Sequence, residues 1–168
     1  GAQADLFGAV GRDASAAQLR LGLAEQRVGC GGLVPVPGYQ TSTKTRIVAQ
    51  KQQVTRLDRE TRGDIPPAIT RKLVRQIEDA LDTADAVSIG DYAKGVVTQP
   101  LVDALREACR ARGRWISLDP KPGHPLDLRG LSLLTPNRKE AFELAGLTDS
   151  VRHPNPLEDG PLLQEIGR

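Results

Sequence analysis

Cysteine is scarce in this chain, and its scarcity excludes two kinds of structural support. The 168 residues include two cysteines, Cys30 and Cys109, which are far apart and have no neighbouring Cys or His at a ligand spacing. The sequence therefore indicates neither a disulfide framework nor a zinc site, and we expect both thiols to be small buried apolar groups. A domain of this length buries about two thirds of its unfolded surface without such support.

Long apolar runs, a strong charge of one sign and the glycine motifs of nucleotide-binding loops are also missing. The longest apolar runs, such as 131–134, fall far short of the ~20 residues of a membrane span, and no charged-then-apolar signal segment opens the chain. The 23 basic and 21 acidic residues are interspersed. We therefore expect a cytoplasmic protein that binds neither membrane nor nucleic acid but has room for a small anionic substrate. The GCGG segment at 29–32 lacks a following Gly-Lys-Ser/Thr, so it is no P-loop, and GxGxxG does not occur.

The sequence does contain a repeated order of short apolar run, polar loop and helix-period segment. This order is typical of βα units around a parallel sheet, so the predicted fold class is α/β. It predicts buried strands over 5–10, 86–90, 115–118 and 131–135. It also predicts helices over about 14–26, 99–112 and 138–145, and one following 64–67 whose inward face carries Ile69, Leu73, Ile77 and Leu81. Residues 151–168 read as a loop and the start of a further helix.

One region departs from this alternation. Residues 41–59, TSTKTRIVAQKQQVTRLDR, are rich in Thr, Val, Gln and Arg and partly alternate apolar with polar residues. They predict two extended strands exposed on one side, as in a lid or platform. The turn between them lacks Gly and Asn, so the pattern leaves the hairpin register open.

Polar residues directly follow three of the predicted strands. The segments are GDYAKG at 90–95, DPK at 119–121 and TPNRKE at 135–140. Ligands of open α/β sheets bind outside the carboxyl ends of the strands. Lysines suit anionic oxygens and carboxylates suit Mg²⁺, directly or through water, and phosphoryl transfer requires both.

Each candidate also has a structural interpretation. Asn137 and Glu140 form a helix capping box, and on that ground alone a structural role is favoured. Asp119 suits a turn before proline, and Lys94 and Lys121 suit the surface. Asp13 suits a helix cap. His124 and His153 suit exposed positions without a role. The remaining candidates suit the solvated face of a strand pair: Arg46, Gln53, Arg56 and Asp58.

Four strings carry a resemblance to a known family, namely TSTKTRIVAQKQQVTRLDRE, GDYAKGVVTQPLV, SLDPK and LLTPNRKEAFELAG. In order and spacing they resemble the kinase domain of the heptose phosphate kinase and ADP-heptose synthase family, which belongs to the ribokinase-like, or PfkB, carbohydrate kinases. The resemblance runs from Gly1 to about Pro156. It implies one partial ribokinase-like kinase domain over 1–168, with 41–59 in a small β lid. The family's DYGKG is DYAKG here, a change that should be tolerated if Ala93 needs no positive φ.

The resemblance also implies a reaction and its site. The γ-phosphate of ATP would move to the anomeric hydroxyl of D-glycero-D-manno-heptose 7-phosphate, with Mg²⁺ as cofactor. Residues near ATP would be Asn137, Arg138, Lys139 and Glu140, with Glu140 on the Mg²⁺ shell and with Asp119 and Lys121 beside the transferred phosphates. Residues near the sugar phosphate would be Arg46, Gln53, Asp91 and Lys94, and the lid sheet would pair two subunits in a homodimer.

Two of the family's motifs do not occur in these residues. One is a glycine-rich, asparagine-containing segment expected before Gly1, and the other is Gly-Ala-Gly-Asp, expected after Arg168, which supplies an anion hole and the aspartate base. No catalytic base is therefore assigned, and with methionine absent throughout we expect a piece of a longer protein with negligible kinase activity alone. The alternatives are a PfkB kinase for another sugar or nucleoside and a non-catalytic binding or dimerisation module.

Overall fold

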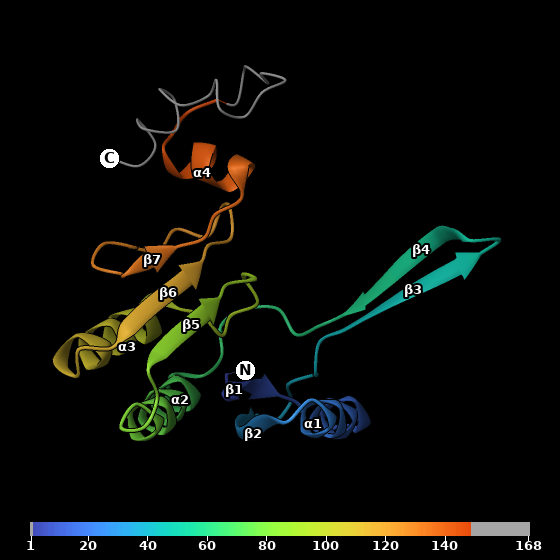
Figure 1. Cartoon of the computed structure of the whole chain (residues 1–168). Coiled ribbons are helices and arrows are strands. Elements are labelled where there is room, and N and C mark those ends of the chain that lie inside the picture. The colour runs from blue at the N-terminus through green and yellow to red at the C-terminus, as the bar shows by residue number, and fades with distance from the viewer. Residues whose placement is uncertain (1, 149–168) are drawn as a thin grey trace.

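A computed structural model of the chain describes residues 2–148 and has an α/β architecture (Figure 1). The predicted segment 151–168, with His153, lies outside these residues. The elements in chain order are β1 (Ala4–Val10), α1 (Ala14–Glu25), β2 (Val28–Pro35), β3 (Thr43–Ala49), β4 (Gln52–Arg59), α2 (Pro67–Ala80), β5 (Ala86–Gly90), α3 (Gln99–Ala111), β6 (Trp115–Asp119), β7 (Leu133–Leu134) and α4 (Arg138–Leu144). The predicted α/β alternation is therefore present.

The helices begin and end close to the predicted residues, because their apolar spacing marks the buried faces. A side chain caps the start of α1 and of α4, whereas α2 and α3 begin without a side-chain cap. On α2 the side chains of Leu73 and Ile77, with Leu81 directly after the helix, lie in the core and are at most 8% exposed. They pack with the buried face of α3, and Gly113 with φ +62° follows the end of α3. Among the described residues, no helix is long and apolar enough to cross a membrane.

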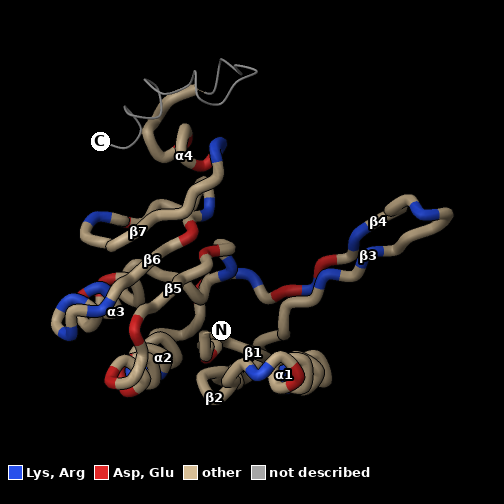
Figure 2. Tube along the Cα trace, viewed as in Figure 1, with Lys and Arg blue, Asp and Glu red and all other residues tan. Residues whose placement is uncertain are grey.

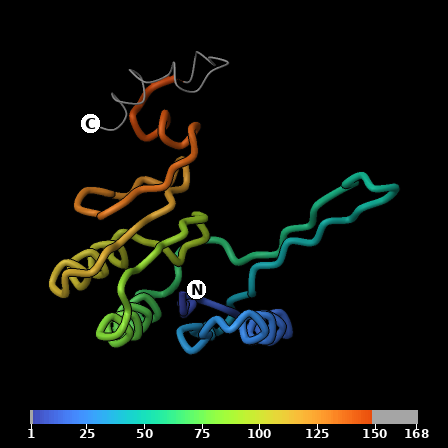
Figure 3. Tube along the Cα trace, viewed as in Figure 1, coloured from blue at the N-terminus to red at the C-terminus, as the bar shows by residue number. Residues whose placement is uncertain are grey.

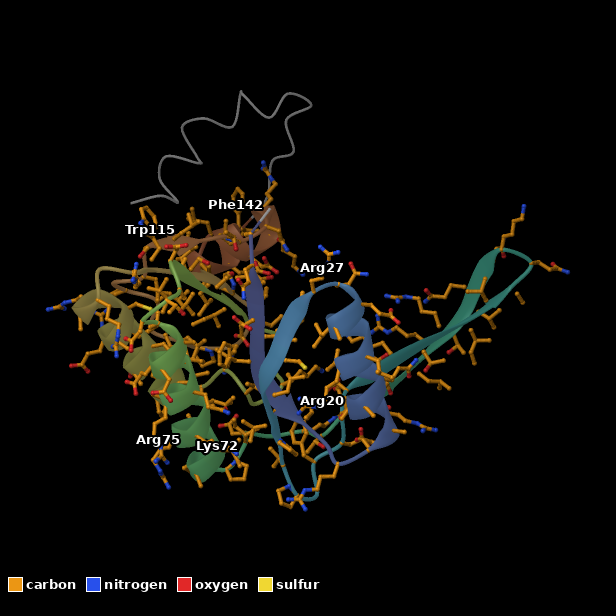
Figure 4. The ribbon with its side chains drawn as sticks, turned by 60° about the horizontal axis from the view of Figure 1, so that its bottom comes forward. Arg20, Arg27, Lys72, Arg75, Trp115 and Phe142 are labelled. Atoms are coloured by element: carbon orange, nitrogen blue, oxygen red, sulfur yellow. The ribbon has the colours of Figure 1, made fainter. Side chains whose placement is uncertain are left out.

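The strand β2 is one element that periodicity did not predict. Its sequence VGCGGLVP pairs in parallel with β1, and two of its three glycines, Gly29 and Gly32, are needed there because side chains of β1 pack over them. A Cβ at Gly32 would lie 2.2 Å from the ring of Phe7. Arg20 on α1 donates to the carbonyl oxygens of Cys30 and Leu33, at 2.9 and 2.7 Å, and so ties α1 to β2 (Figure 4).

The parallel sheet is interrupted between β1 and β5. Strands β1 and β2 form one hydrogen-bonded group and β5, β6 and β7 another, with β6 in the middle. All of β5 and residues 5–10 of β1 line a cavity of ≈ 560 Å³, together with side chains of α2 and α3. Leu6 on β1 is 40% exposed as a result.

The strands β3 and β4 form an antiparallel hairpin that projects from the rest of the chain (Figures 1 and 3). The prediction of two extended strands is confirmed, but the expectation of exposure on one side is wrong, since every residue of β4 and six of the seven in β3 are exposed. The turn places Gln50 and Lys51 at φ +48° and +65°. Two-residue hairpin turns favour this geometry, usually with Asn or Gly, so the usual sequence signal was missing.

Two expectations about burial are wrong. The predicted buried strand 131–135 shortens to β7, where Leu133 and Leu134 are 51% and 37% exposed, because β7 is the edge of its sheet. Of the two cysteines, Cys109 is fully buried as expected, whereas Cys30 is only half-buried.

Candidate active site

The polar end of the larger cavity lies where the base of the β3–β4 hairpin approaches the end of β5. Lining side chains there include Ser42, Lys44, Glu60, Asp91 and Lys94. The Nζ of Lys94 lies 2.6 Å from Oε1 of Glu60, which directly follows β4. Figure 2 shows acidic and basic residues together at this junction. The predicted residues Lys94 and Asp91 therefore lie on one cavity, and the ion pair joins the base of the hairpin to the loop after β5.

The GDYAKG loop has a backbone that depends on its small residues. Ala93 has φ +50°. The expectation that alanine is tolerated here required a position without a positive φ, and that requirement is not met. Its N–H donates to Oδ1 of Asp91 at 2.8 Å, which supports the turn. Gly95 has φ +78°, and a Cβ there would lie 1.9 Å from the carbonyl oxygen of Gly63. The N–H of Ile65 donates to the carbonyl oxygen of Gly95 at 2.9 Å, and this bond holds the loop against the segment after the hairpin.

Asp91, in the first polar strand end, contacts the second one. It is 5% exposed, and its N–H donates to the carbonyl oxygen of Asp119 at 3.0 Å. Its Oδ2 lies 2.6 Å from Nδ1 of His124. The expectation that His124 is exposed and without a role is wrong, because the loop after β6 folds back and gives the imidazole a buried carboxylate as partner.

A second, smaller pocket of ≈ 330 Å³ lies beside this junction. Its lining residues include Lys121 and His124 from the loop after β6, and Glu140 and Glu143 from α4. Asp119 lies near it and its Oδ1 accepts from the hydroxyl of Thr135 at 3.4 Å. The second and third polar strand ends thus each contribute a candidate residue, Lys121 and Glu140, to one pocket.

The structural interpretation of Asn137 and Glu140 is confirmed. The Asn137 side chain accepts from the N–H of Glu140 at 3.1 Å, and the Asn137 N–H donates to the Glu140 carboxylate at 2.8 Å. On the same helix, Arg138 stacks over Phe142 with 5.0 Å to the ring centroid, and Lys139 lies 3.6 Å from Glu143. These contacts explain why a helix begins at this segment. The roles of residues 137–140 toward ATP stay predictions.

Two predicted substrate residues lie elsewhere. Arg46 and Gln53 are on the hairpin, where Arg46 pairs with Arg56 across the strands and Gln53 pairs with Val48 close to the turn. Neither is among the residues that line the larger cavity. Arg56 forms an ion pair with Asp58 at 2.8 Å, as a solvated strand face would. Their contact with a sugar phosphate stays a prediction that needs the hairpin to approach the cavity.

Sequence reasoning missed Lys44, Glu60 and His124. The first two stand inside or beside the hairpin strings, but only the position of the hairpin base reveals that they line the cavity. His124 has no partner at a recognisable spacing, since Asp91 is thirty-three residues away along the chain. No local signal in the sequence could have joined this pair.

The hairpin base is also attached to the end of β1. Asp13 caps α1 by accepting from the N–H of Ala16 at 2.9 Å, and its second oxygen accepts from the N–H of Thr41 at 2.9 Å. The Thr41 hydroxyl accepts from the N–H of Gly11 at 2.8 Å. The hydrogen bonds from Thr41, and then from Ala16, lower the pKa of Asp13 below 3.8. The predicted cap is confirmed, with an added role in placing the hairpin.

The Glu140 carboxylate at the smaller pocket suits a magnesium ion that is bound to nucleotide phosphates. Within residues 2–148, no group of three or more His, Cys, Asp or Glu side chains could hold a metal ion. Mg²⁺ commonly keeps several waters and binds through one or two carboxylates together with substrate phosphates. Glu140 on the smaller pocket fits that mode, directly or through water.

Comparisons with known proteins identify relatives of this chain. Bifunctional protein HldE of Trichlorobacter lovleyi is 31% identical over 165 residues, which cover 98% of this chain and 32% of that protein. Its counterpart in Caulobacter vibrioides is 38% identical over 151 residues, which cover 89% of this chain and 30% of that protein. The chain thus spans about a third of the length of the curated relatives it matches.

Solved structures show the fold. A ribokinase from Giardia lamblia has a TM-score of 0.62 at 19% identity, covering 85% of this chain and 47% of that chain. Phosphofructokinase-2 from Escherichia coli has a TM-score of 0.64 at 17% identity, covering 98% of this chain and 52% of that chain. The family described as pfkB family carbohydrate kinase matches residues 1–159. The chain therefore belongs to the pfkB family of carbohydrate kinases, and its α/β core has the ribokinase-like fold.

Proposed function

We propose that this chain is part of an ATP-dependent kinase that phosphorylates D-glycero-D-manno-heptose 7-phosphate at O1, for the synthesis of ADP-heptose and lipopolysaccharide core. The observation that carries the proposal is the pair of adjoining sites at successive strand ends. One contains Lys94 and Asp91, the other Lys121 and Glu140. Curated relatives named bifunctional protein HldE, at 31% and 38% identity, support the choice of this branch of the family.

In this proposal the larger cavity receives the sugar phosphate at its polar end. Lys94 is a point charge suited to a phosphate, and its present partner Glu60 is exchanged for the ligand or shares the lysine with it. Lys44 at the hairpin base adds a second positive charge on the same cavity. Arg46 and Gln53 join them only when the hairpin moves over the cavity. The hairpin then acts as the lid.

The smaller pocket receives the phosphates of ATP. Lys121 offsets their charge, and Glu140 holds Mg²⁺ together with the phosphates and water. Asn137, Arg138 and Lys139 border the nucleotide from the start of α4, and Asp119 lies near the transferred phosphate. Mg²⁺ supplies charge neutralisation for the phosphoryl group, while these side chains orient the nucleotide toward the cavity.

We also propose that the protein forms a homodimer through the hairpin. Strand alternation and register place Ile47 and Leu57 on one face, with Thr45 and Thr55 beside them and Arg59 at the end near the base of the hairpin. They place Arg46, Arg56 and Asp58 on the other face. Ile47 and Leu57 are 45% and 54% exposed. A two-stranded sheet is marginal by itself, so covering this apolar face with the same face of a second copy stabilises both.

The cellular setting and the activity of the chain alone follow from the same proposal. A kinase for soluble sugar phosphate and ATP works in the cytoplasm.

The interrupted sheet between β1 and β5 supports the proposal that these residues alone have negligible activity and that further parts of the polypeptide complete the site. A pfkB kinase for another sugar is the second candidate, favoured by the low identity to each curated relative.

A coupled ADP-release assay tests the proposal. The longer protein that contains this chain, and the chain by itself, are mixed with ATP, Mg²⁺ and heptose 7-phosphate, and phosphorus NMR locates the new phosphate. Turnover by the longer protein with the phosphate on O1 supports the proposal. No turnover on heptose 7-phosphate, with turnover on fructose 6-phosphate or ribose, contradicts it in favour of the second candidate.

A further inference from the structure

We propose that His124 is a positioning residue for phosphoryl transfer. Through its contact with Asp91 it fixes the loop after β6, residues 120–125, against the loop after β5, residues 91–95. The two loops carry Lys121 and Lys94, one on each pocket. This inference rests on the proposed function, because it concerns how the two substrates of that reaction are held in line.

The contact is built around a buried carboxylate. The Asp91 side chain is 1% exposed, and each of its oxygens has one partner: Oδ1 accepts from the N–H of Ala93 at 2.8 Å, and Oδ2 lies 2.6 Å from Nδ1 of His124. Burying a carboxylate without hydrogen-bond partners costs free energy, so the Asp91 side chain favours keeping both of these partners. An N–H on Nδ1 is the donor that the carboxylate needs.

The loop after β6 needs an anchor of this kind. Its sequence, PKPGHP, contains three prolines, which have no N–H to donate, and Gly123 has φ +74°. Its internal hydrogen bond, from the N–H of His124 to the carbonyl oxygen of Lys121 at 3.1 Å, closes a turn within the loop. The His124 side chain is the group that ties this turn to the neighbouring strand end.

The pair also stands between the two pockets. Asp91 lines the larger cavity and His124 lines the smaller pocket, so their contact sets the distance between the groups that bind the two substrates. Loss of the imidazole frees the turn that carries Lys121 but leaves Lys94 on its own loop with Glu60. The affinity for each substrate should then change little, while the alignment needed for transfer is lost.

The test compares His124→Ala, His124→Asn and a control, Arg129→Ala, in the longer protein that contains this chain. Asn places a side-chain N–H where Nδ1 of histidine stands, and Arg129 is a 90% exposed side chain shortly after the loop. We expect kcat to fall about 10–100-fold in His124→Ala with KM for sugar phosphate unchanged, since a displacement of about 1 Å can cost about 100-fold. His124→Asn should recover most of the rate, and Arg129→Ala should match the wild type.

Amide hydrogen exchange at Lys121, Gly123 and His124 supplies a readout that does not need turnover. Faster exchange there in His124→Ala, with unchanged exchange in α2 and α3, supports the contact. Unchanged exchange overturns the inference. Faster exchange with unchanged kcat, or equal losses in the Ala and Asn variants, also overturns it, because the contact would then serve folding alone. A wild type that phosphorylates no sugar phosphate contradicts the proposed function, whereas the exchange result still decides whether His124 holds the loop.

Discussion

Ala93 occupies a backbone conformation that favours glycine. Its φ of +50° costs an L-residue about 1–2 kcal/mol, whereas glycine in the unfolded chain has more freedom worth about 0.5–1 kcal/mol. We therefore expect Ala93→Gly to stabilise the folded state by about 0.5–1 kcal/mol. Thermal unfolding measures the change. Ala104→Gly within α3 is the control and should destabilise; a similar loss in Ala93→Gly would contradict the account.

Asp13 should make stability depend on pH in the acid range. The hydrogen bond from Thr41, and then the one from Ala16, lower its pKa below 3.8. A lowered pKa contributes stability that is present above the unfolded value and is lost as the pH falls through the folded value. Asp13→Ala should therefore be less stable than the wild type at neutral pH, with the difference in melting temperature shrinking below pH 3.8. A difference that stays constant down to the most acid pH measured would contradict this assignment.

The candidate site residues differ in how far the neighbouring sequence indicates them. Lys94, Asp91, Lys121 and Glu140 stand in the polar segments that follow apolar strands, and in the folded chain each lies on a pocket, while their roles toward substrates stay predictions. His124 could not, because its partner comes from another strand end and histidine spacing carries no information about that contact.

At the scale of single elements, α4 combines an observed capping box with the proposed contact of Glu140 to Mg²⁺. Its capping box uses the Glu140 carboxylate, and glutamine can make the same hydrogen bond to the Asn137 N–H. Glu140→Gln should therefore keep the melting temperature but lower kcat and raise the Mg²⁺ concentration needed for half-maximal rate, since an amide binds Mg²⁺ less well. Initial rates over a Mg²⁺ series measure this. Glu107→Gln, an exposed glutamate of α3, is the control; an unchanged Mg²⁺ dependence in Glu140→Gln would remove it from the metal shell.

The hairpin supplies a prediction about assembly. Burying a charge in an apolar interface is costly, so Ile47→Asp should shift the protein from dimer to monomer in sedimentation velocity. Leu21→Asp is the matched control, because Leu21 is 68% exposed on α1, outside the hairpin. A dimer that persists in Ile47→Asp, or a monomeric wild type, would contradict pairing through this face.

Elements with strong periodicity were predictable and edge elements were not. The regular apolar spacing of α2 and α3 reflects a buried face, and that face is present. The strand β2 escaped detection because glycines that admit Phe7 and Asp5 replace the expected branched residues. The burial of β7 was misjudged, because an apolar run does not reveal whether anything covers the edge of a sheet.

On the scale of the whole molecule, the arrangement of the strand groups decides what the chain can do. Among residues 2–148, the order β1–β2 and β5–β6–β7 leaves one edge of β1 and one edge of β5 unpaired on a large cavity, which no sequence pattern within the chain indicates. The α/β class followed from alternation of the elements, whereas the gap depends on contacts between distant residues. The polar strand ends nevertheless lie together, because parallel strands end at the same edge of a sheet.

The most direct test of the account compares heptose 7-phosphate with unphosphorylated heptose in the longer protein, for the wild type, Lys94→Ala and the control Lys72→Ala, whose side chain lies on the outside of α2 (Figure 4). From initial rates, we predict that the wild type and Lys72→Ala have a much higher kcat/KM for the phosphorylated sugar. Lys94→Ala should lose most of that preference with an unchanged KM for ATP. Equal weakening for both sugars and for ATP, or a wild type without the preference, would contradict a phosphate site at Lys94.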